Sequence, residues 1–293
     1  MNCNLCPRRC NAPRRDGKNG FCGVPDAAMV CRAAPHFGEE PCISGTRGSG
    51  AVFFAGCNLR CVFCQNHAIS RGAAGEPVSV ARLRDIFLAL RDQGVHNLNL
   101  VTPTHFSDVI AAALDGLDLG IPVVWNSSGY ESVETLRRLE GLVQVYMPDF
   151  KYADAALSAR YSAAPDYPQT ALAAISEMYR QTGPFVMDAD GMLQRGLLIR
   201  HLILPGAPEN TLRVIDAVED YFPAEHILFS LMCQYTPMPG LENYPELQRR
   251  VSAAEYERCA SYLEFSDICH GYTQSPESAT DEMIPAFAGT GVK

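Results

Sequence analysis

The chain has 293 residues, of which 47% are hydrophobic and 19% are charged. This composition supports a folded core and is not typical of a disordered protein. The net charge of −9 argues against a nucleic-acid backbone as the main partner, and no apolar run reaches the roughly 18 residues of a membrane span. Because twelve cysteines occur without a recognisable signal peptide, we expect a cytoplasmic protein whose thiols bind metals or clusters.

Residues 1–50 are expected to form a small module built of loops, because they are rich in Cys, Arg, Gly and Pro and show no sustained period. Its candidate ligands are Cys3, Cys6, Cys10 and Cys22. Four thiolates can close a tetrahedral zinc site or hold a second iron–sulfur cluster, and the spacing does not choose between them. Free thiols are the third alternative.

Two acidic residues, Glu39 and Glu40, stand side by side before Pro41 near the end of this module. Such a pair is suited to acid–base chemistry, but adjacent acids before a proline are more often solvated turn residues. We expect Glu39 and Glu40, together with the nearby His36 and Cys42, to be structural.

A second group of cysteines follows the apolar run at 51–55. Cys57, Cys61 and Cys64 have the spacing C-x3-C-x2-C, and the next cysteine is Cys233. Three thiolates on one tight loop would hold three irons of a four-iron cluster and leave the fourth iron open to an exogenous ligand. A zinc loop or three buried thiols are the alternatives, although zinc sites more often use paired C-x2-C units.

From residue 51 onward, expected strands and helices alternate. The strands are expected at 51–56, 97–102, 122–126, 143–147, 196–204 and 226–232. The helices are expected at 79–90, 107–117, 131–139, 168–182, 209–221 and 253–265. Continuously apolar strands separated by helices indicate a parallel sheet covered on both faces. We therefore predict an α/β protein with a partial TIM-type (β/α)6 barrel over residues 51–270, followed by a tail at 271–293.

In barrels of this type, chemistry takes place at the carboxyl ends of the strands. Beyond the cysteine loop, the polar residues expected there are Thr102, Thr104, His105, Asn126, Asp149, Lys151, Arg200, His201 and Tyr235. Their convergence on one mouth predicts an active site, in which the histidines and the tyrosine are candidates either for proton relay or for hydrogen-bonded structural roles.

The stretch from Gly56 to Asn66 resembles the radical S-adenosylmethionine (SAM) superfamily. The resemblance implies a [4Fe–4S] cluster on the three loop cysteines, whose open iron chelates SAM, with Phe63 near the adenine and Asn66 beside the same pocket. It also implies that one electron from a flavodoxin- or ferredoxin-type donor cleaves SAM to a 5′-deoxyadenosyl radical, which abstracts hydrogen from a substrate.

Within the superfamily, the chain is most similar to the pyruvate formate-lyase activating enzymes and their relatives. This likeness implies that Asp149, Lys151 and Arg200 line the SAM pocket and that a glycyl radical enzyme is the partner. In place of the family's Gly-Gly-Glu element after the second strand, however, the chain has Thr102-Pro103-Thr104-His105. We therefore expect Thr102 or Thr104 to receive the amino group of SAM.

Two other functions remain open at this point. One is a radical SAM enzyme that modifies a small molecule or a peptide, with the amino-terminal cysteines holding an auxiliary cluster. The other is a non-catalytic metal-binding or redox protein, which the empty fourth ligand position disfavours.

Overall fold

The computed structural model describes residues 3–71, 74–275 and 285–292. Its strands lie in one sheet, in the order β10-β9-β8-β6-β5-β4-β2-β1-β3, with β7 paired to β8. Their bounds are β1 (Ala28–His36), β2 (Ser49–Phe54), β3 (Glu76–Val78), β4 (Leu98–Val101), β5 (Val123–Ser127), β6 (Val145–Pro148), β7 (Val186–Met187), β8 (Leu193–Leu202), β9 (Leu228–Met232) and β10 (Gly271–Thr273).

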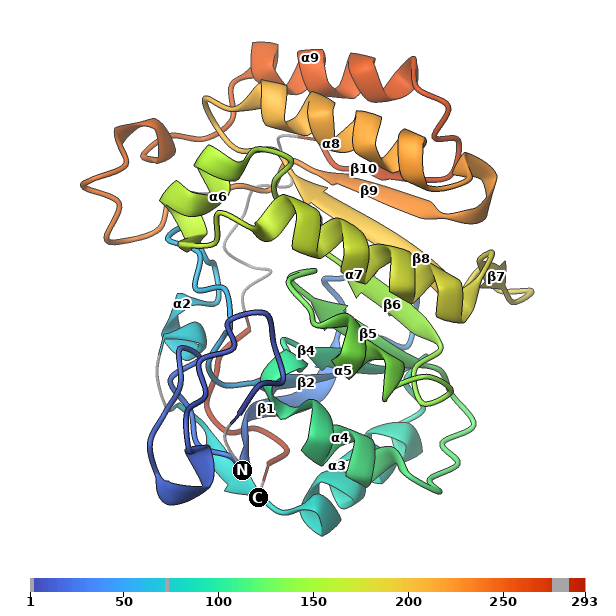
Figure 1. Ribbon diagram of the computed structural model, residues 1–293. Helices are drawn as coiled ribbons and strands as arrows, with labels where there is room; N and C mark the ends of the chain where they lie inside the picture. The colour runs from blue at the N-terminus through green and yellow to red at the C-terminus, as the bar shows by residue number, and fades with distance from the viewer. Residues whose placement is uncertain (1–2, 72–73, 276–284, 293) are drawn as a thin grey trace.

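The central part of this sheet is parallel. Strands β2, β4, β5, β6, β8 and β9 pair in that order in parallel register, and β10 continues it beside β9. The strands β2, β4, β5, β6, β8 and β9 are the six predicted strands, so the α/β fold class with a mainly parallel sheet is confirmed. Figure 1 shows that the sheet curves without closing, as a partial barrel does, with α3, α4, α5, α7 and α8 along its outer side.

The helices between the strands agree closely with the predicted ones. Their bounds are α1 (Pro41–Ser44), α2 (His67–Ser70), α3 (Val80–Asp92), α4 (Ser107–Leu114), α5 (Val133–Arg137), α6 (Ala155–Ser162), α7 (Tyr167–Thr182), α8 (Pro208–Tyr221) and α9 (Ala253–Glu264), with short 3₁₀ turns at Arg14–Asp16, Thr104–Phe106, Ala224–His226 and Pro245–Leu247. Helix α3 begins after Ser79, whose hydroxyl accepts the backbone N–H of Arg82 as expected of an N-cap. Helix α6 was not predicted; Asp154 caps its start, and Ala163 ends it in the left-handed conformation.

The second half of the predicted loop-built module is instead part of the sheet. Strand β1 pairs antiparallel with β2 on one side and with β3 on the other. The short helix α1 then places Cys42 and Ile43 against Val124 and Met147, which belong to the inward-facing residues of the parallel strands. The prediction missed β1 because Arg32 and Pro35 interrupt its apolar run, although both suit a strand near the margin of a sheet.

The carboxyl-terminal segment returns to the same margin. Residues 285–292 lie along β1, where Ala33 donates to the carbonyl of Thr290 at 2.8 Å, and the ring of Phe287 packs edge-on against Phe53. Met283 and Ile284, two further apolar residues of the tail, lie outside the described residues. In the part of the chain that the structure describes, no helix is both long and apolar enough to cross a bilayer.

Candidate active site

The cysteine loop begins where β2 ends. Gly56 makes the turn with a φ of +76°, a conformation that glycine adopts without strain. The backbone of the loop is then held from two sides, because Gly56 donates to the carbonyl of Ile69 at 2.8 Å and Val62 donates to that of Tyr161 at 2.9 Å. The loop is therefore fixed by the strand before it, by α2 and by α6.

Two of the three loop cysteines have a hydrogen-bond donor beside the sulfur. The backbone N–H of Leu59 donates to Cys57 at 3.3 Å, and the hydroxyl of Ser162 donates to Cys61 at 3.0 Å. Such donors stabilise thiolates bound to iron. The three sulfurs therefore fit a cluster that binds one iron to each, which the loop would hold with Cys57, Cys61 and Cys64.

Burial disfavours the thiolates of Cys57 and Cys64 in the absence of a metal. It raises the pKa of Cys57 to about 12 and also raises the pKa of Cys64, which the nearby charge of Lys151 partly offsets. Metal binding must therefore displace the thiol protons. This is the behaviour expected of buried ligands rather than of reactive surface thiols.

Ten residues predicted to hold the cluster or SAM line one cavity, which excludes Thr104, the alternative to Thr102. They are Cys57, Cys61, Phe63, Cys64, Asn66, Thr102, Asn126, Asp149, Lys151 and Arg200. The cavity lies at the carboxyl ends of the parallel strands, because these residues follow or end β2, β4, β5, β6 and β8. Their individual roles stay predictions, but the convergence of five strand ends on one space is what the barrel hypothesis required.

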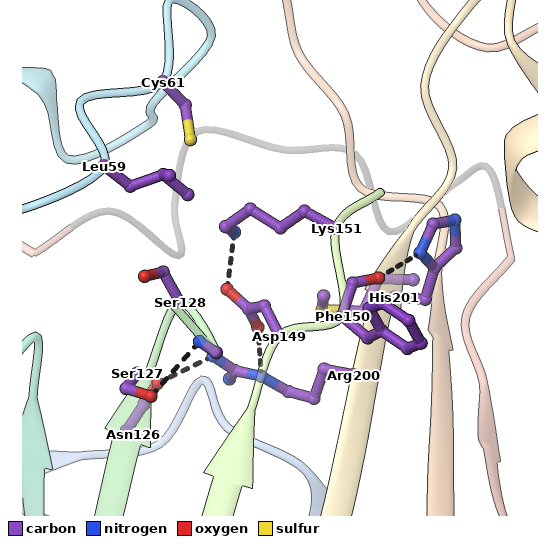
Figure 2. Close-up of polar contacts among 12 residues, drawn as sticks. Leu59, Cys61, Asn126, Ser127, Ser128, Asp149, Phe150, Lys151, Arg200 and His201 are labelled. Atoms are coloured by element: carbon purple, nitrogen blue, oxygen red, sulfur yellow. Dashed lines mark hydrogen bonds and ion pairs between the residues drawn. The ribbon is translucent and has the colours of Figure 1, made fainter. Parts of the chain in front are cut away.

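A network of charges occupies one wall of this cavity (Figure 2). Asp149 accepts from Lys151 at 2.6 Å through one oxygen and from Arg200 at 2.9 Å through the other. Arg200 also donates to Asn126 at 2.8 Å and to Glu39 at 2.9 Å. The guanidinium therefore joins residues of β5, β6 and β8 to the segment before α1.

The electrostatics of this network keep both cations and Asp149 charged. Burial alone would raise the pKa of Asp149, but the charges of Arg200 and Lys151 outweigh burial and leave that pKa lowered. Burial would likewise lower the pKa of Lys151, and the charge of Asp149 outweighs it. In Figure 2 the ammonium of Lys151 lies on the side of Asp149 that faces Cys61.

The sequence prediction was wrong about Glu39 and Glu40, which are not solvated turn residues. Both line the cavity: Glu39 accepts from Arg200, and it also accepts from Asn99 and Asn126 at 3.1 Å each. Glu40 is only 5% exposed, and burial raises the pKa of its carboxyl. No local pattern predicts that Glu39 lies in the cavity, because its partners come from β4, β5 and β8. The only signal in the sequence was the unusual pairing of two acidic residues.

Several other predicted mouth residues are buried elsewhere. His105 is 1% exposed and makes its ring contact with the carbonyl of Ala55, and His201 is 0% exposed between Phe150 and Thr211. Burial lowers the pKa of each histidine to about 4, which keeps both neutral.

Thr104 also points away from the site, because it is buried and donates to Glu131 at 2.7 Å. Of the two threonines considered for the amino group of SAM, only Thr102 lines the cavity. Tyr235 lines it as well, but its hydroxyl is occupied by the carbonyl of Leu247 at 2.7 Å. Tyr235 therefore anchors the loop before α9, and its phenol is not free to relay protons.

The four amino-terminal cysteines do not line the cavity. They lie on the side of the cysteine loop away from the cavity. There the backbone N–H of Cys57 donates to the carbonyl of Cys22 at 3.4 Å. Within the described ranges, no three metal-binding side chains converge on one point, either here or in the cysteine loop. A four-iron cluster does not need such convergence, since each thiolate binds a different iron.

Comparison with known families agrees with this geometry. Residues 51–183 match the model of the radical SAM superfamily. These residues form a radical SAM domain. They include the cysteine loop, the strands β2, β4, β5 and β6, and the residues Asp149 and Lys151. The match to this superfamily implies a [4Fe–4S] cluster and SAM, with SAM cleavage as the reaction.

Individual relatives extend the likeness beyond this domain. The uncharacterized protein MJ0674 of Methanocaldococcus jannaschii is 29% identical over 273 residues, which are 90% of this chain and 74% of that protein. Two crystal structures of SuiB from Streptococcus suis, one bound to the precursor peptide SuiA, superpose with TM-scores of 0.52 and 0.51 at 13% and 14% identity. Each superposition covers 75% of this chain but only 46% or 47% of SuiB, so it shows the fold alone.

Proposed function

We propose that this radical SAM protein is an oxidoreductase that abstracts hydrogen from a glycyl radical enzyme, in the manner of the pyruvate formate-lyase activating enzymes. The observation that carries the proposal is the placement of Asp149, Lys151 and Arg200 on the wall of the cavity lined by the three loop cysteines. The bound cluster and SAM would supply the radical chemistry. We propose a flavodoxin- or ferredoxin-type protein as the electron donor.

The residues of the chain would bind and orient SAM. Lys151 uses one N–H on Asp149, and its remaining two can bind a carboxylate as charge-assisted donors. Thr102 is the cavity residue that follows β4, where the SAM amino group is expected. The ring of Phe63, which has Tyr161 and Tyr235 edge-on at 6.2 Å each, offers an apolar surface for the adenine.

Unsatisfied polar atoms support a ligand of this kind in the cavity. The side-chain oxygens of Asn66, Ser128 and Thr236 are buried and have no hydrogen-bond partner within the described part of the chain, and all three residues line the cavity. A buried polar atom without a partner costs about 1–3 kcal/mol. Polar groups of SAM or of a substrate would remove that cost.

A second candidate function is the modification of a small polar molecule or a peptide. The observation that favours it is Glu40, whose Oε2 is buried without a hydrogen bond among the described residues and lies 3.8 Å from Arg200. A carboxyl in this position would recognise a hydrogen-bond donor such as an amine. Under this proposal, a Glu40→Gln variant would still cleave SAM in an assay without substrate. It would no longer turn over an amine substrate.

The proposed chemistry is tested by anaerobic reconstitution with iron and sulfide, followed by SAM, dithionite and measurement of 5′-deoxyadenosine. The control is the triple variant Cys57→Ala, Cys61→Ala and Cys64→Ala. Formation of 5′-deoxyadenosine by the wild type alone supports the proposal. A wild type that holds no cluster and does not bind SAM would contradict it. A glycyl radical signal on a captured partner protein would then favour the activase, and turnover of an amine would favour the second candidate.

A further inference from the structure

The amino-terminal segment is hydrogen-bonded to the cysteine loop through the side chain of one arginine, Arg8. Arg8 lies between Cys6 and Cys10, and its guanidinium donates to the backbone carbonyls of Asn58 at 2.8 Å and Leu59 at 3.4 Å. The same group donates to the carbonyls that end α6, those of Ser162 and Ala163. One side chain thus ties the cysteine loop to α6, which itself supplies the hydroxyl on Cys61.

The position of Arg8 is set by its own segment. Its guanidinium stacks 3.9 Å from the ring centroid of Phe21, the residue before Cys22. The carbonyl of Cys22 also touches the other end of the loop, because a Cβ on Gly56 would lie 2.6 Å from it. The segment that carries the four cysteines is therefore the outer support of the loop.

This segment has little core of its own. Between residues 3 and 26, its buried apolar residues are Cys6, Ala12, Cys22 and Val24. A segment this short and this poor in apolar contacts usually needs a metal or a disulfide for stability. Cys3, Cys6, Cys10 and Cys22 form no disulfide with one another or with any other described residue.

The backbone nevertheless gathers the four cysteines. Cys3 pairs with Ala12 in a β-bridge, and Gly20 packs so closely on Cys10 that a Cβ there would lie 2.6 Å from its sulfur. Cys6 is within electrostatic range of Cys3 and Cys22, and Cys22 is within range of Cys3 and Cys10. Three separate stretches of chain thus meet around Cys22.

Backbone donors also face two of these sulfurs. The N–H of Arg8 lies against Cys6 and the N–H of Val24 against Cys22, in each case from two residues further along the chain. Donors in this position stabilise thiolates that bind a metal. Without a cation, nothing draws the sulfurs of the four cysteines together. Binding of a cation would require their side chains to rotate toward one point.

We propose that Cys3, Cys6, Cys10 and Cys22 bind a single Zn²⁺ ion as four thiolates, and that this ion holds Arg8 and Cys22 against the cysteine loop. A single ion suits the segment better than a second four-iron cluster, because Gly20 already packs against the sulfur of Cys10, where a Cβ would lie 2.6 Å away, and the bulkier cluster would require more of the segment to move. The inference rests on the proposed function only for the identity of the cluster that the loop carries.

The test compares the full-length wild type with the double variant Cys6→Ser/Cys22→Ser and with Arg8→Gln, all produced with zinc and iron and reconstituted anaerobically. Elemental analysis should find about one zinc per wild-type chain and per Arg8→Gln chain, and none in the double variant. The rate at which a ferrous chelator strips iron should rise about tenfold in both variants, as for lost outer support of a metal site. Cys269→Ser, at an exposed thiol, should match the wild type in both measurements.

Three outcomes would overturn the inference. Zinc retained by the double variant would exclude these ligands, and a second cluster without zinc in the wild type would exclude the metal. An unchanged rate of iron release in Arg8→Gln would exclude the mechanical link. Since zinc content does not depend on SAM, a failure of SAM cleavage with zinc in place would count against the proposed function alone.

Discussion

The two sides of the cysteine loop hold their arginines in opposite ways. On the cavity side, Arg200 is surrounded by carboxylates, with Asp149 and Glu39 at 2.9 Å and Glu40 at 3.8 Å. On the outer side, Arg8 and Arg14 donate to backbone carbonyls, and neither forms an ion pair with any of the described residues.

This difference indicates that the arginine on the cavity side is suited to ligand binding and that the arginines on the outer side support the main chain. Carboxylates and ammonium groups that pair with one another can exchange partners when a charged ligand enters, so the network of Asp149, Lys151 and Arg200 is suited to binding. An arginine that spans several carbonyls fixes the path of the main chain and has no such freedom. Arg14 extends this second mode, since it joins the carbonyls of Val24 and His105 while only 2% exposed.

The largest effect on stability is expected for Arg200→Met. The change leaves Asp149 with Lys151 alone and removes the cation that pairs with Glu39 and Glu40, so these two buried carboxylates lose their charge partner. We expect a loss of about 3–5 kcal/mol in the free energy of unfolding. Urea unfolding followed by circular dichroism would measure it.

Arg8→Met provides the matched comparison on the outer side. It removes hydrogen bonds to carbonyls but leaves no unpaired charge, so its cost should be smaller than that of Arg200→Met. If the two variants lose equal stability, the distinction between the two modes is wrong.

Glu131 lies between the two regions and should make stability depend on pH. Burial raises its pKa to about 7, against the hydrogen bonds from Thr104, Trp125 and Ser127 that lower it. The folded protein therefore binds this proton more tightly than the unfolded chain, and its contribution falls as pH rises from about 4.5 to about 7. Relative to Glu131→Gln, the wild type should lose about 3 kcal/mol across that window.

The thermal midpoints of the wild type and of Glu131→Gln, measured at several pH values, give this difference directly. Because both proteins contain the same buried histidines, His105 and His201, their opposite contribution cancels. A constant difference between pH 4.5 and 7 would show that Glu131 has an ordinary pKa.

The contact between the outer support and the loop can be tested at Gly56. Its φ is +76°, and a Cβ would lie 2.6 Å from the carbonyl of Cys22, whereas Gly94 has a φ of +79° and nothing within 4 Å. Gly94→Ala should therefore cost only the strain of the left-handed conformation, about 1 kcal/mol. Gly56→Ala should cost about 1–3 kcal/mol more, because it also forces the two segments apart.

The iron content after reconstitution provides the second measurement for this pair. It should fall in Gly56→Ala, where the support of the cysteine loop is disturbed, and stay at the wild-type value in Gly94→Ala. Equal iron contents would mean that the segment before residue 26 does not shape the loop.

The sequence predicted what depends on local pattern. The six parallel strands have continuous apolar runs, and the spacing of Cys57, Cys61 and Cys64 is a property of one loop, so both were predictable. Strand β1 was missed because its run is broken by Arg32. Helix α6 was missed because its stretch has no strong apolar period.

The parts of the site that were missed depend on long-range packing. Glu39 meets Arg200 across 161 positions of sequence, and no local period reports such a contact. The same reason explains why the sequence left the roles of His105 and His201 open: each follows or ends a strand as a mouth residue would, but its side chain turns into the core. A polar residue at a strand end can face either way, and only the packing around it decides.

The smallest effect on the protein, and the most informative about binding, is expected for Lys151→Met. Asp149 keeps its hydrogen bond from Arg200 at 2.9 Å, so the free energy of unfolding should fall by only about 1 kcal/mol, the net contribution of one lost hydrogen bond. The affinity of the reconstituted protein for SAM should fall about tenfold, because an ammonium that can pair with the SAM carboxylate is lost. Isothermal titration of SAM would measure that loss, with Arg8→Met expected to bind SAM as the wild type does while it retains its cluster. Weakened SAM binding in Lys151→Met without weakened folding is the behaviour of an exchangeable partner; the reverse result would place Lys151 among the fixed supports and leave the carboxylate of SAM to Arg200.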